Sequence, residues 1–256
     1  MSRSDPWPAG TPCWADIGVP DLDEARAFYA AVAGWEIPPG MPEWGGYTLA
    51  THDGAAAAGL GPLMAEGQPV AWTLYLASDD VDRTAEQIVA AGGTVVLPPD
   101  QVGSFGRMCI AADPTGAVFG VWQAGEMVGF DAPGEVGGWV WCDLRSTEPA
   151  AAQDFYASVF GYVYTPLEMA GPDYRVFSLT GEAGGELGGM GSMMGAPEGT
   201  PSHWLVYVAV ADLDAALAEV ASRGGTSLAE PFDSPYGRMG PILDPWGAPL
   251  WLMQAA

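Results

Sequence analysis

The chain has 256 residues, of which 32 are acidic and 8 basic, so its formal net charge is −24. Such a negative surface repels phosphate backbones and anionic lipid headgroups, which argues against nucleic-acid and membrane partners. With 49% hydrophobic and 16% charged residues, the composition is that of a folded globular protein. Three widely spaced cysteines argue against a disulfide framework or a zinc knuckle. The N-terminal segment has no apolar stretch typical of a signal peptide, so we expect a cytoplasmic protein.

The first half of the chain predicts alternating strands and helices. Residues 12–19 alternate in polarity like a strand, and residues 22–33 place apolar side chains at helical spacing. Asp21 is the expected N-cap of this helix and Gly34 the residue that ends it. A second helix is expected at 80–91. The other expected elements are extended segments near 46–51, 57–64, 71–77, 94–97, 106–112 and 117–123, the last two joined by an Asp-Pro-x-Gly turn.

The second half of the chain repeats the first. Residues 21–29 are echoed by residues 148–156, and both segments end in Phe-Tyr. Two further motifs recur in the same order: Phe105-Gly106-Arg107-Met108 as Tyr236-Gly237-Arg238-Met239, and Asp113-Pro114-Thr115-Gly116 as Asp244-Pro245-Trp246-Gly247. Helices are therefore expected again near 148–159 and 212–223. We predict two domains, 1–126 and 135–256, joined by a linker at 127–134.

The repeated motifs, Phe-Tyr in the helix after a first strand and Asp-Pro-x-Gly before a last strand, resemble those of the vicinal oxygen chelate superfamily. This group includes glyoxalase I, bleomycin-resistance proteins and extradiol dioxygenases. The opening Gly10-Thr11-Pro12-Cys13-Trp14 resembles that of two-domain, glyoxalase-like proteins of actinobacteria, often labelled hydroxylase-like. The resemblance implies an α+β fold of four βαβββ modules. These modules would form two tandem domains, each with a mixed sheet cupped around a cleft.

The metal-binding positions of the family carry unsuitable residues in this chain. Enzymes of the family usually hold a divalent metal with His and Glu from three strands. The resemblance maps these positions onto Trp14, Thr73 and Gly120 in the first half, and onto Trp141, Leu205 and Trp251 in the second. Thr73 is at best a weak oxygen donor, and the others are no ordinary ligands. We therefore predict no metal site and no other cofactor, which disfavours metal-dependent isomerisation and ring cleavage.

Aromatic and acidic residues occupy the predicted clefts instead. A Trp-x-Asp pair recurs at Trp14 and Asp16 and at Trp141 and Asp143, and strand alternation places both members on one face. The candidate ligand contacts are Trp14, Trp141, Tyr47, Tyr174, Trp122, Trp251, Met190, Arg107 and Arg238. Alternatively, the tryptophans fill the space of a lost metal site and Met190 packs in a core or loop. The two aspartates would then be structural carboxylates, with Arg107 and Arg238 as their candidate partners.

Two classes of function follow from these residues. The favoured class is a metal-independent protein that binds or sequesters a hydrophobic aromatic metabolite or antibiotic, with a cation favoured by the negative charge. The alternative is a metal-free enzyme of secondary metabolism, an isomerase, cyclase, dehydratase or hydroxylase-associated protein. In that case Asp143, Asp16 or His203 would act as general acid or base. A methylglyoxal-handling enzyme is a further alternative, and both a monomer and a homodimer remain open.

Overall fold

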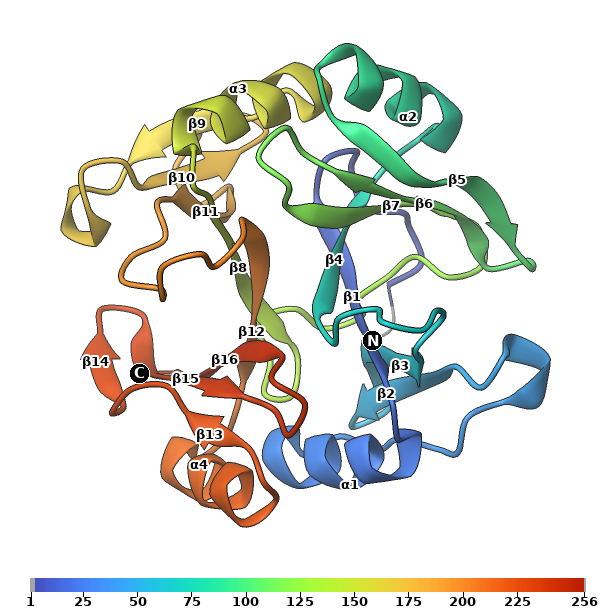
Figure 1. Ribbon diagram of the computed structural model, residues 1–256, viewed down its shortest axis with the longest axis vertical. Coiled ribbons are helices and arrows are strands. Elements are labelled where there is room, and N and C mark those ends of the chain that lie inside the picture. The colour runs from blue at the N-terminus through green and yellow to red at the C-terminus, as the bar shows by residue number, and fades with distance from the viewer. Residues whose placement is uncertain (1–2, 256) are drawn as a thin grey trace.

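The computed structural model describes residues 3–255 and contains two mixed β-sheets, each formed by one half of the chain and flanked by helices (Figure 1). The first half contains β1 (Pro12–Val19), α1 (Leu22–Ala33), the 3-10 turn η1 (Pro42–Trp44), β2 (Thr48–His52), β3 (Ala55–Pro62), β4 (Trp72–Ala77), α2 (Val81–Ala90), β5 (Thr94–Val102), β6 (Gly106–Ala112) and β7 (Val118–Ala124). The second half contains β8 (Trp139–Arg145), α3 (Pro149–Phe160), β9 (Val163–Pro166), the 3-10 turn η2 (Glu168–Ala170), β10 (Arg175–Ser178), β11 (Glu186–Gly191), β12 (His203–Ala209), α4 (Leu213–Ser222), β13 (Thr226–Ser227), β14 (Phe232–Ser234), β15 (Gly237–Leu243) and β16 (Pro249–Ala255).

Strand order is duplicated along with the sequence. The first sheet runs β2-β3-β1-β4-β7-β6-β5, and the second runs β13-β15-β16-β12-β8-β11-β10-β9, with β14 also paired to β15. In each sheet the first strands of two modules pair in antiparallel fashion, β1 with β4 and β8 with β12. Each central strand also has a parallel neighbour from its own module. The prediction of an α+β fold with tandem modules and mixed sheets is confirmed.

Three of the four α-helices described within residues 3–255 begin at an aspartate that caps them, as the sequence predicts. The carboxylate of Asp21 accepts a hydrogen bond from the backbone N–H of Glu24, and Gly34 ends α1 in a left-handed conformation with φ 71°. Asp80 and Asp212 cap α2 and α4 in the same way.

One module has fewer strands than predicted. Glu36 forms only an isolated bridge to Thr51, where the other modules have a strand after their helix, β5, β9 or the two-residue β13. Pro38 and Pro39 follow after Ile37, and because proline lacks an N–H group, they cannot continue a hydrogen-bonded ladder.

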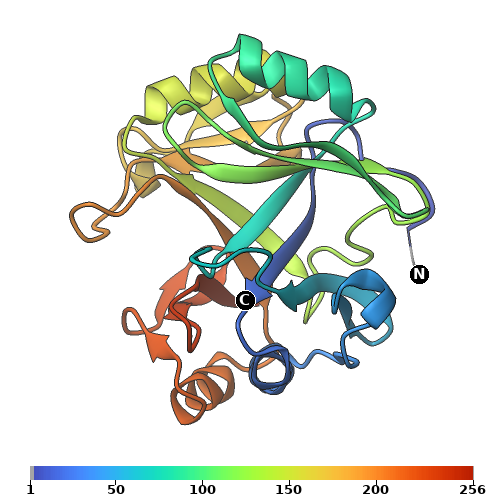
Figure 2. The ribbon, with the colours of Figure 1, turned by 45° about the vertical axis from the view of Figure 1, so that its right-hand side comes forward.

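The two domains pack through helix pairs that each contain one helix from each half. Helix α1 lies against α4, and α2 against α3, at opposite ends of the molecule (Figure 2). The hydroxyl of Tyr29 on α1 donates to Asp244 of the second domain at 2.8 Å. Strand β12 also contacts β4 of the first sheet. Within residues 3–255, no helix is long and apolar enough to cross a membrane.

Candidate functional site

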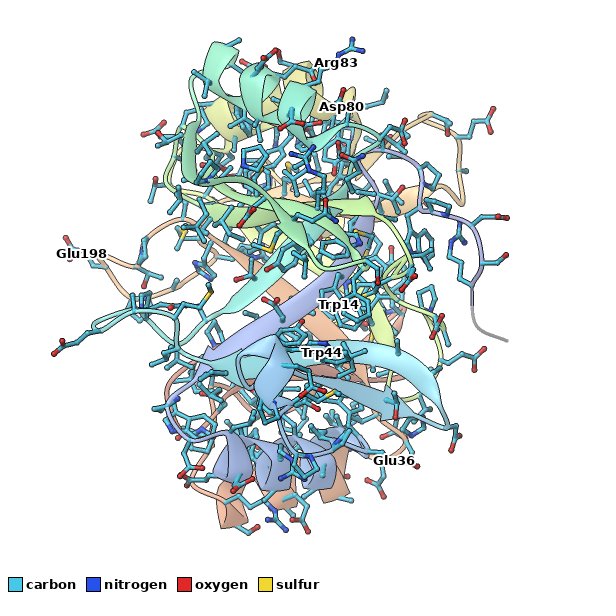
Figure 3. The ribbon with its side chains drawn as sticks, turned by 90° about the vertical axis from the view of Figure 1, so that its right-hand side faces the viewer. Trp14, Glu36, Trp44, Asp80, Arg83 and Glu198 are labelled. Atoms are coloured by element: carbon cyan, nitrogen blue, oxygen red, sulfur yellow. The ribbon has the colours of Figure 1, made fainter. Side chains whose placement is uncertain are left out.

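The first sheet is curled so that its two edges meet. Trp44 precedes the edge strand β2, and Phe105 lies in the turn after the opposite edge strand β5. Their rings touch edge to face, with centroids 5.0 Å apart. Helix α2 packs on the other face of this sheet, so the curled face is the one that carries Trp14, which is labelled with Trp44 in Figure 3. Asp16 lies two residues further along β1 and therefore on the same face. We call this concave face the first cup, and the equivalent face of the second sheet the second cup.

The second cup is more open at its rim. Met169 of η2 and Tyr236, which occupies the place of Phe105 in the repeat, are 68% and 57% exposed. Phe232 is also exposed and lies against Trp251 with ring centroids 6.0 Å apart. The rim of the second cup therefore has solvent-exposed aromatic rings, whereas Trp44 and Phe105 at the rim of the first cup pack against each other.

The residues at the family's metal positions do not fit a metal ion. In the first cup the ring of Tyr75 lies against Gly120, and a Cβ at that position would be 2.1 Å from its Cδ1 atom. In the second cup Trp251 takes the position of Gly120 and stacks on Tyr207 at 5.1 Å. Across residues 3–255, no group of three His, Cys, Asp or Glu side chains could hold a metal ion. Aromatic rings thus lie at two of the positions that the family resemblance maps onto metal ligands, Gly120 and Trp251.

A cluster of Trp14, Asp16, Tyr47 and Tyr75, here called the first Asp cluster, occupies the first cup. Oδ2 of Asp16 accepts hydrogen bonds from the hydroxyls of Tyr75 at 3.0 Å and Tyr47 at 3.3 Å. The indole Nε1 of Trp14 donates to the Tyr47 hydroxyl at 3.1 Å. Among the described residues, Oδ1 of Asp16 has no hydrogen-bond partner.

Burial changes the acid–base chemistry of this cluster. Desolvation raises the pKa of Asp16 to about 7, although the two tyrosine hydroxyls partly oppose this shift. The pKa values of Tyr47 and Tyr75 are raised well above the usual range, first by burial and then by the neighbouring Asp16. Asp16 can therefore bind or release a proton near neutral pH, while both tyrosines remain hydrogen-bond donors.

The second Asp cluster contains the equivalent residues and one addition. Oδ1 of Asp143 accepts from Tyr174 at 2.6 Å and from Trp141 at 3.1 Å, and Oδ2 accepts from Tyr207 at 2.6 Å. The addition is Arg145, whose Nη2 lies 2.5 Å from Oδ2 of Asp143. Because Asp143 is only 2% exposed and both oxygens have partners, this carboxylate is fully satisfied within the protein.

Two glycines make room for the tyrosines. Gly59 and Gly189 pair directly with Asp16 and Asp143 on the neighbouring parallel strands. A Cβ at Gly59 would lie 1.7 Å from the Tyr47 hydroxyl, and at Gly189 1.8 Å from that of Tyr174. Each tyrosine hydroxyl can reach its aspartate only because the opposing residue has no side chain.

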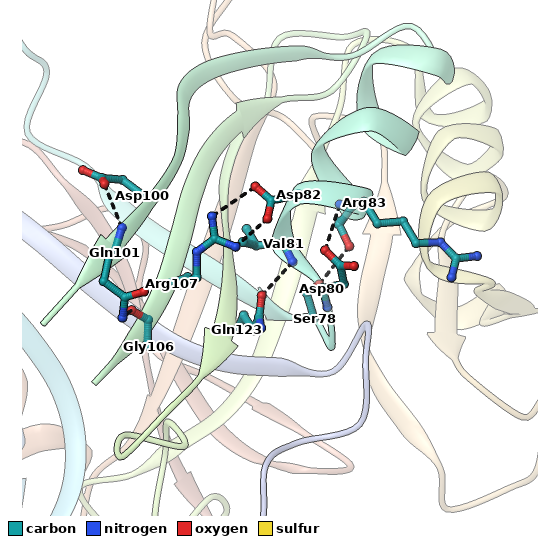
Figure 4. Close-up of polar contacts among 11 residues, drawn as sticks. Ser78, Asp80, Val81, Asp82, Arg83, Asp100, Gln101, Gly106, Arg107 and Gln123 are labelled. Atoms are coloured by element: carbon teal, nitrogen blue, oxygen red, sulfur yellow. Dashed lines mark hydrogen bonds and ion pairs between the residues drawn. The ribbon is translucent and has the colours of Figure 1, made fainter. Parts of the chain in front are cut away.

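The predicted pairing of Arg107 and Arg238 with Asp16 and Asp143 is wrong. Arg107 forms a two-pronged ion pair with Asp82 on α2 (Figure 4), and Arg238 pairs with Asp214 on α4. The hydrogen bond that Asp82 accepts from Arg107 lowers the pKa of this carboxylate. Both arginines therefore join a strand to the first turn of a helix at the surface. Their repeated register reflects a structural pair, which sequence alone could not separate from a pair inside the cup.

The remaining predicted site residues have mixed positions. Met190 is 1% exposed and contacts the Tyr164 hydroxyl, so it belongs to the core. Trp122 is buried and donates to the carbonyl of Met127 in the connection between the domains. His203 is half-buried, lies beside Arg145 on the paired strand, and its Nδ1 is 2.8 Å from the carbonyl oxygen of Pro201. None of these three touches either aspartate.

Three residues of the clusters were missed by sequence reasoning. Tyr75 and Tyr207 stand two residues after Thr73 and Leu205 in both halves, so the repeat contained the signal that would have identified them. Arg145 has no arginine counterpart in the first half, because Gly18 occupies the equivalent position, and a search for repeated residues cannot find it.

A cavity of about 300 Å³ lies outside both cups. It is lined by Trp7 and Pro8 of the N-terminal segment and by Leu179 and Leu187 of the second domain. Inside the first cup, Trp14 and Tyr75 are 3% and 5% exposed, whereas Asp16, Tyr47 and Trp44 are half-buried. The surface available to a ligand in the first cup is therefore formed by these half-buried groups.

Comparison with known proteins agrees with this architecture. The family model described as "Glyoxalase/Bleomycin resistance protein/Dioxygenase superfamily" matches residues 13–121 and 138–252. A Mycobacterium bovis protein named "Putative glyoxylase CFP32" is 38% identical over 100% of this chain and 99% of its own length. The Streptomyces peucetius protein named "Anthracycline biosynthesis protein DnrV" is 35% identical over 97% of this chain and 93% of its own length.

A solved structure shares the fold at low sequence identity. The Mn(II)-bound glyoxalase from Novosphingobium aromaticivorans superposes with a TM-score of 0.68 at 18% identity, covering 99% of this chain and 83% of that one. The matches to both halves by the family model, together with the full-length relatives, establish the family. The chain belongs to the glyoxalase, bleomycin resistance protein and dioxygenase superfamily.

Proposed function

We propose that this chain is a metal-independent protein that binds a flat, hydrophobic aromatic small molecule in its cups. The observation that carries the proposal is the set of tyrosine and tryptophan side chains that surrounds an aspartate in both domains. None of the residues that the family resemblance maps onto the metal positions is an ordinary metal ligand. Aromatic walls with a few fixed polar groups suit a planar ligand, which can stack on the rings and orient by hydrogen bonds. The relative named for anthracycline biosynthesis supports a role in secondary metabolism.

The proposal places the ligand against aromatic side chains that solvent can reach. In the first cup these are Trp44 and Tyr47, and in the second cup Trp141 and Trp251. Ring stacking at such positions buries apolar area on both partners and does not require a metal.

Tryptophan fluorescence titration with neutral hydroxymethyl-anthraquinone, on EDTA-treated protein, tests this proposal. We expect saturable quenching, weakened in Trp44→Leu if the first cup binds and in Trp141→Leu if the second does. Trp7→Leu serves as the matched control, because Trp7 lies outside both cups. The absence of saturable quenching with a panel of such planar probes at micromolar concentrations would overturn the proposal.

A second candidate function is metal-free acid–base catalysis by Asp16. The pKa of about 7 at this carboxylate favours it, because proton transfer is most effective when the pKa of the group is near the working pH. Turnover of a bound metabolite by EDTA-treated protein, abolished in Asp16→Asn while binding persists, would support catalysis. Turnover unchanged in that variant would eliminate Asp16 as the acid or base.

A further inference from the structure

The two Asp clusters differ in whether the chain supplies a cation to the carboxylate. Each has a tryptophan, an aspartate, two tyrosines and an opposing glycine in the same register. Two residues after the aspartate, however, the second cluster has Arg145 and the first has Gly18. The chain therefore contains the same carboxylate site twice, once with a cation supplied by the protein and once without.

In the second cluster the guanidinium of Arg145 is held from several sides. It pairs with Asp143, its central carbon lies 5.4 Å from the centre of the Tyr174 ring, and the sulfur of Met194 contacts its other nitrogen. Arg145 is only 8% exposed. A carboxylate beside an aromatic face forms a receptor for a positive charge, and here a residue of the chain fills it.

In the first cluster that receptor has no internal cation. Gly18 has no side chain, and the atoms nearest to where its Cβ would stand are Gln68 Nε2 at 3.4 Å and Leu63 Cδ2 at 3.5 Å. Oδ1 of Asp16 has no partner within residues 3–255, and the residue is half-buried, so the carboxylate can be reached from outside. A half-buried carboxylate without a cation is costly, and a positively charged ligand relieves that cost.

We propose that the first cup binds the protonated amine of an aromatic ligand, with Asp16 and the face of Tyr47 taking the ammonium group where Arg145 lies in the second domain. This inference rests on the function proposed above and adds the ligand class, a planar aromatic molecule that carries a basic nitrogen. The net charge of −24 supports it, because the field of the whole protein concentrates cations at its surface. The second cup excludes such a ligand at the same place, because Arg145 occupies it and repels a second cation.

The test uses matched probes and a substitution copied from the second domain. Binding of 2-naphthylmethylamine and of uncharged 2-naphthylmethanol is measured by titration calorimetry to the unsubstituted protein, to Gly18→Arg and to Gly18→Ala. The measurement is made at pH 8, where Asp16 is mostly ionised. We expect the amine to bind the unsubstituted protein about tenfold more tightly than the alcohol. Gly18→Arg should abolish that preference, whereas Gly18→Ala, whose methyl group meets only ordinary contacts, should keep it.

The outcomes separate this inference from the proposed function. Equal binding of both probes, or an amine preference that survives in Gly18→Arg, would overturn the inference and leave aromatic binding intact. Failure of both probes to bind would contradict the proposed function itself. If Gly18→Arg does not fold, as judged by its thermal unfolding, Asp16→Asn replaces it and should lose the amine preference while still binding the alcohol.

Discussion

Removing the internal cation of the second Asp cluster should destabilise the protein strongly. Arg145→Met keeps most of the apolar stem but leaves the carboxylate of Asp143, which is 2% exposed, without its positive partner. Breaking a buried ion pair on one side typically lowers the free energy of unfolding by 3–5 kcal/mol. Trp141, Tyr174 and Tyr207 still donate to Asp143, so we expect the lower end, about 3 kcal/mol. For a chain of this size, that corresponds to a fall in Tm of roughly 6–12 °C.

Thermal unfolding followed by calorimetry measures this loss, and the chain supplies a matched control. Arg238→Met removes a guanidinium that pairs with Asp214 at the surface, where side chains are 37% and 69% exposed. Such exposed pairs contribute little, so its Tm should change only slightly. The double variant Asp143→Asn with Arg145→Met should recover part of the loss, because no buried charge then remains unpaired. If Arg145→Met were no less stable than Arg238→Met, the claim that the buried Asp143 needs Arg145 for stability would be refuted.

Three further predictions concern the first Asp cluster and the absence of metal ligands. Because the folded state keeps Asp16 protonated up to about pH 7 while the unfolded chain releases that proton near pH 4, its contribution to stability should fall as pH rises between these values. In urea unfolding from pH 4.5 to 8, the free energy of unfolding should fall less with rising pH in Asp16→Asn than in the unsubstituted protein. The same dependence on pH in both proteins would contradict the raised pKa of Asp16. Gly59→Ala should cost about 1–3 kcal/mol by displacing Tyr47, whereas Gly18→Ala should be nearly neutral; equal effects in urea unfolding would argue against the close approach. Finally, EDTA or added Mn²⁺ should leave Tm unchanged, and a Tm that rises with Mn²⁺ concentration would reveal a metal site.

The fold was predictable because its signals are local and repeated. Helix caps such as Asp21 and Gly34, the Asp-Pro-x-Gly turns and the Phe-Tyr motifs each specify backbone geometry within a few residues. The duplication then confirms each signal once more. The strand expected at Glu36 is missing because two prolines nearby cannot donate backbone hydrogen bonds to a neighbouring strand. An alignment of the repeats does not reveal this effect.

The site was only partly predictable, because its partners come from different strands. Strand alternation correctly placed Trp14 with Asp16 on one face, but it could not tell which cation or donor would reach the carboxylate. Arg107 looked suitable by register, yet the first turn of α2 offered it a closer acid, Asp82, at the surface. The actual partner of Asp143 was two residues away on its own strand, at a position where the first half has Gly18.

The exchange of helix contacts between the two halves also bears on how such a chain folds and originates. Tyr29 donates to Asp244 in the last turn of the other domain, and Tyr156 stands beside Asp113 in the reciprocal position. Reciprocal contacts of this kind are the signature of a two-fold symmetric dimer interface. The chain thus resembles a homodimer fused into one polypeptide, in which neither half completes its core alone. In a single chain, unlike in a homodimer, the two copies of one site can also differ in sequence, and here one carboxylate has Arg145 beside it while the other has Gly18.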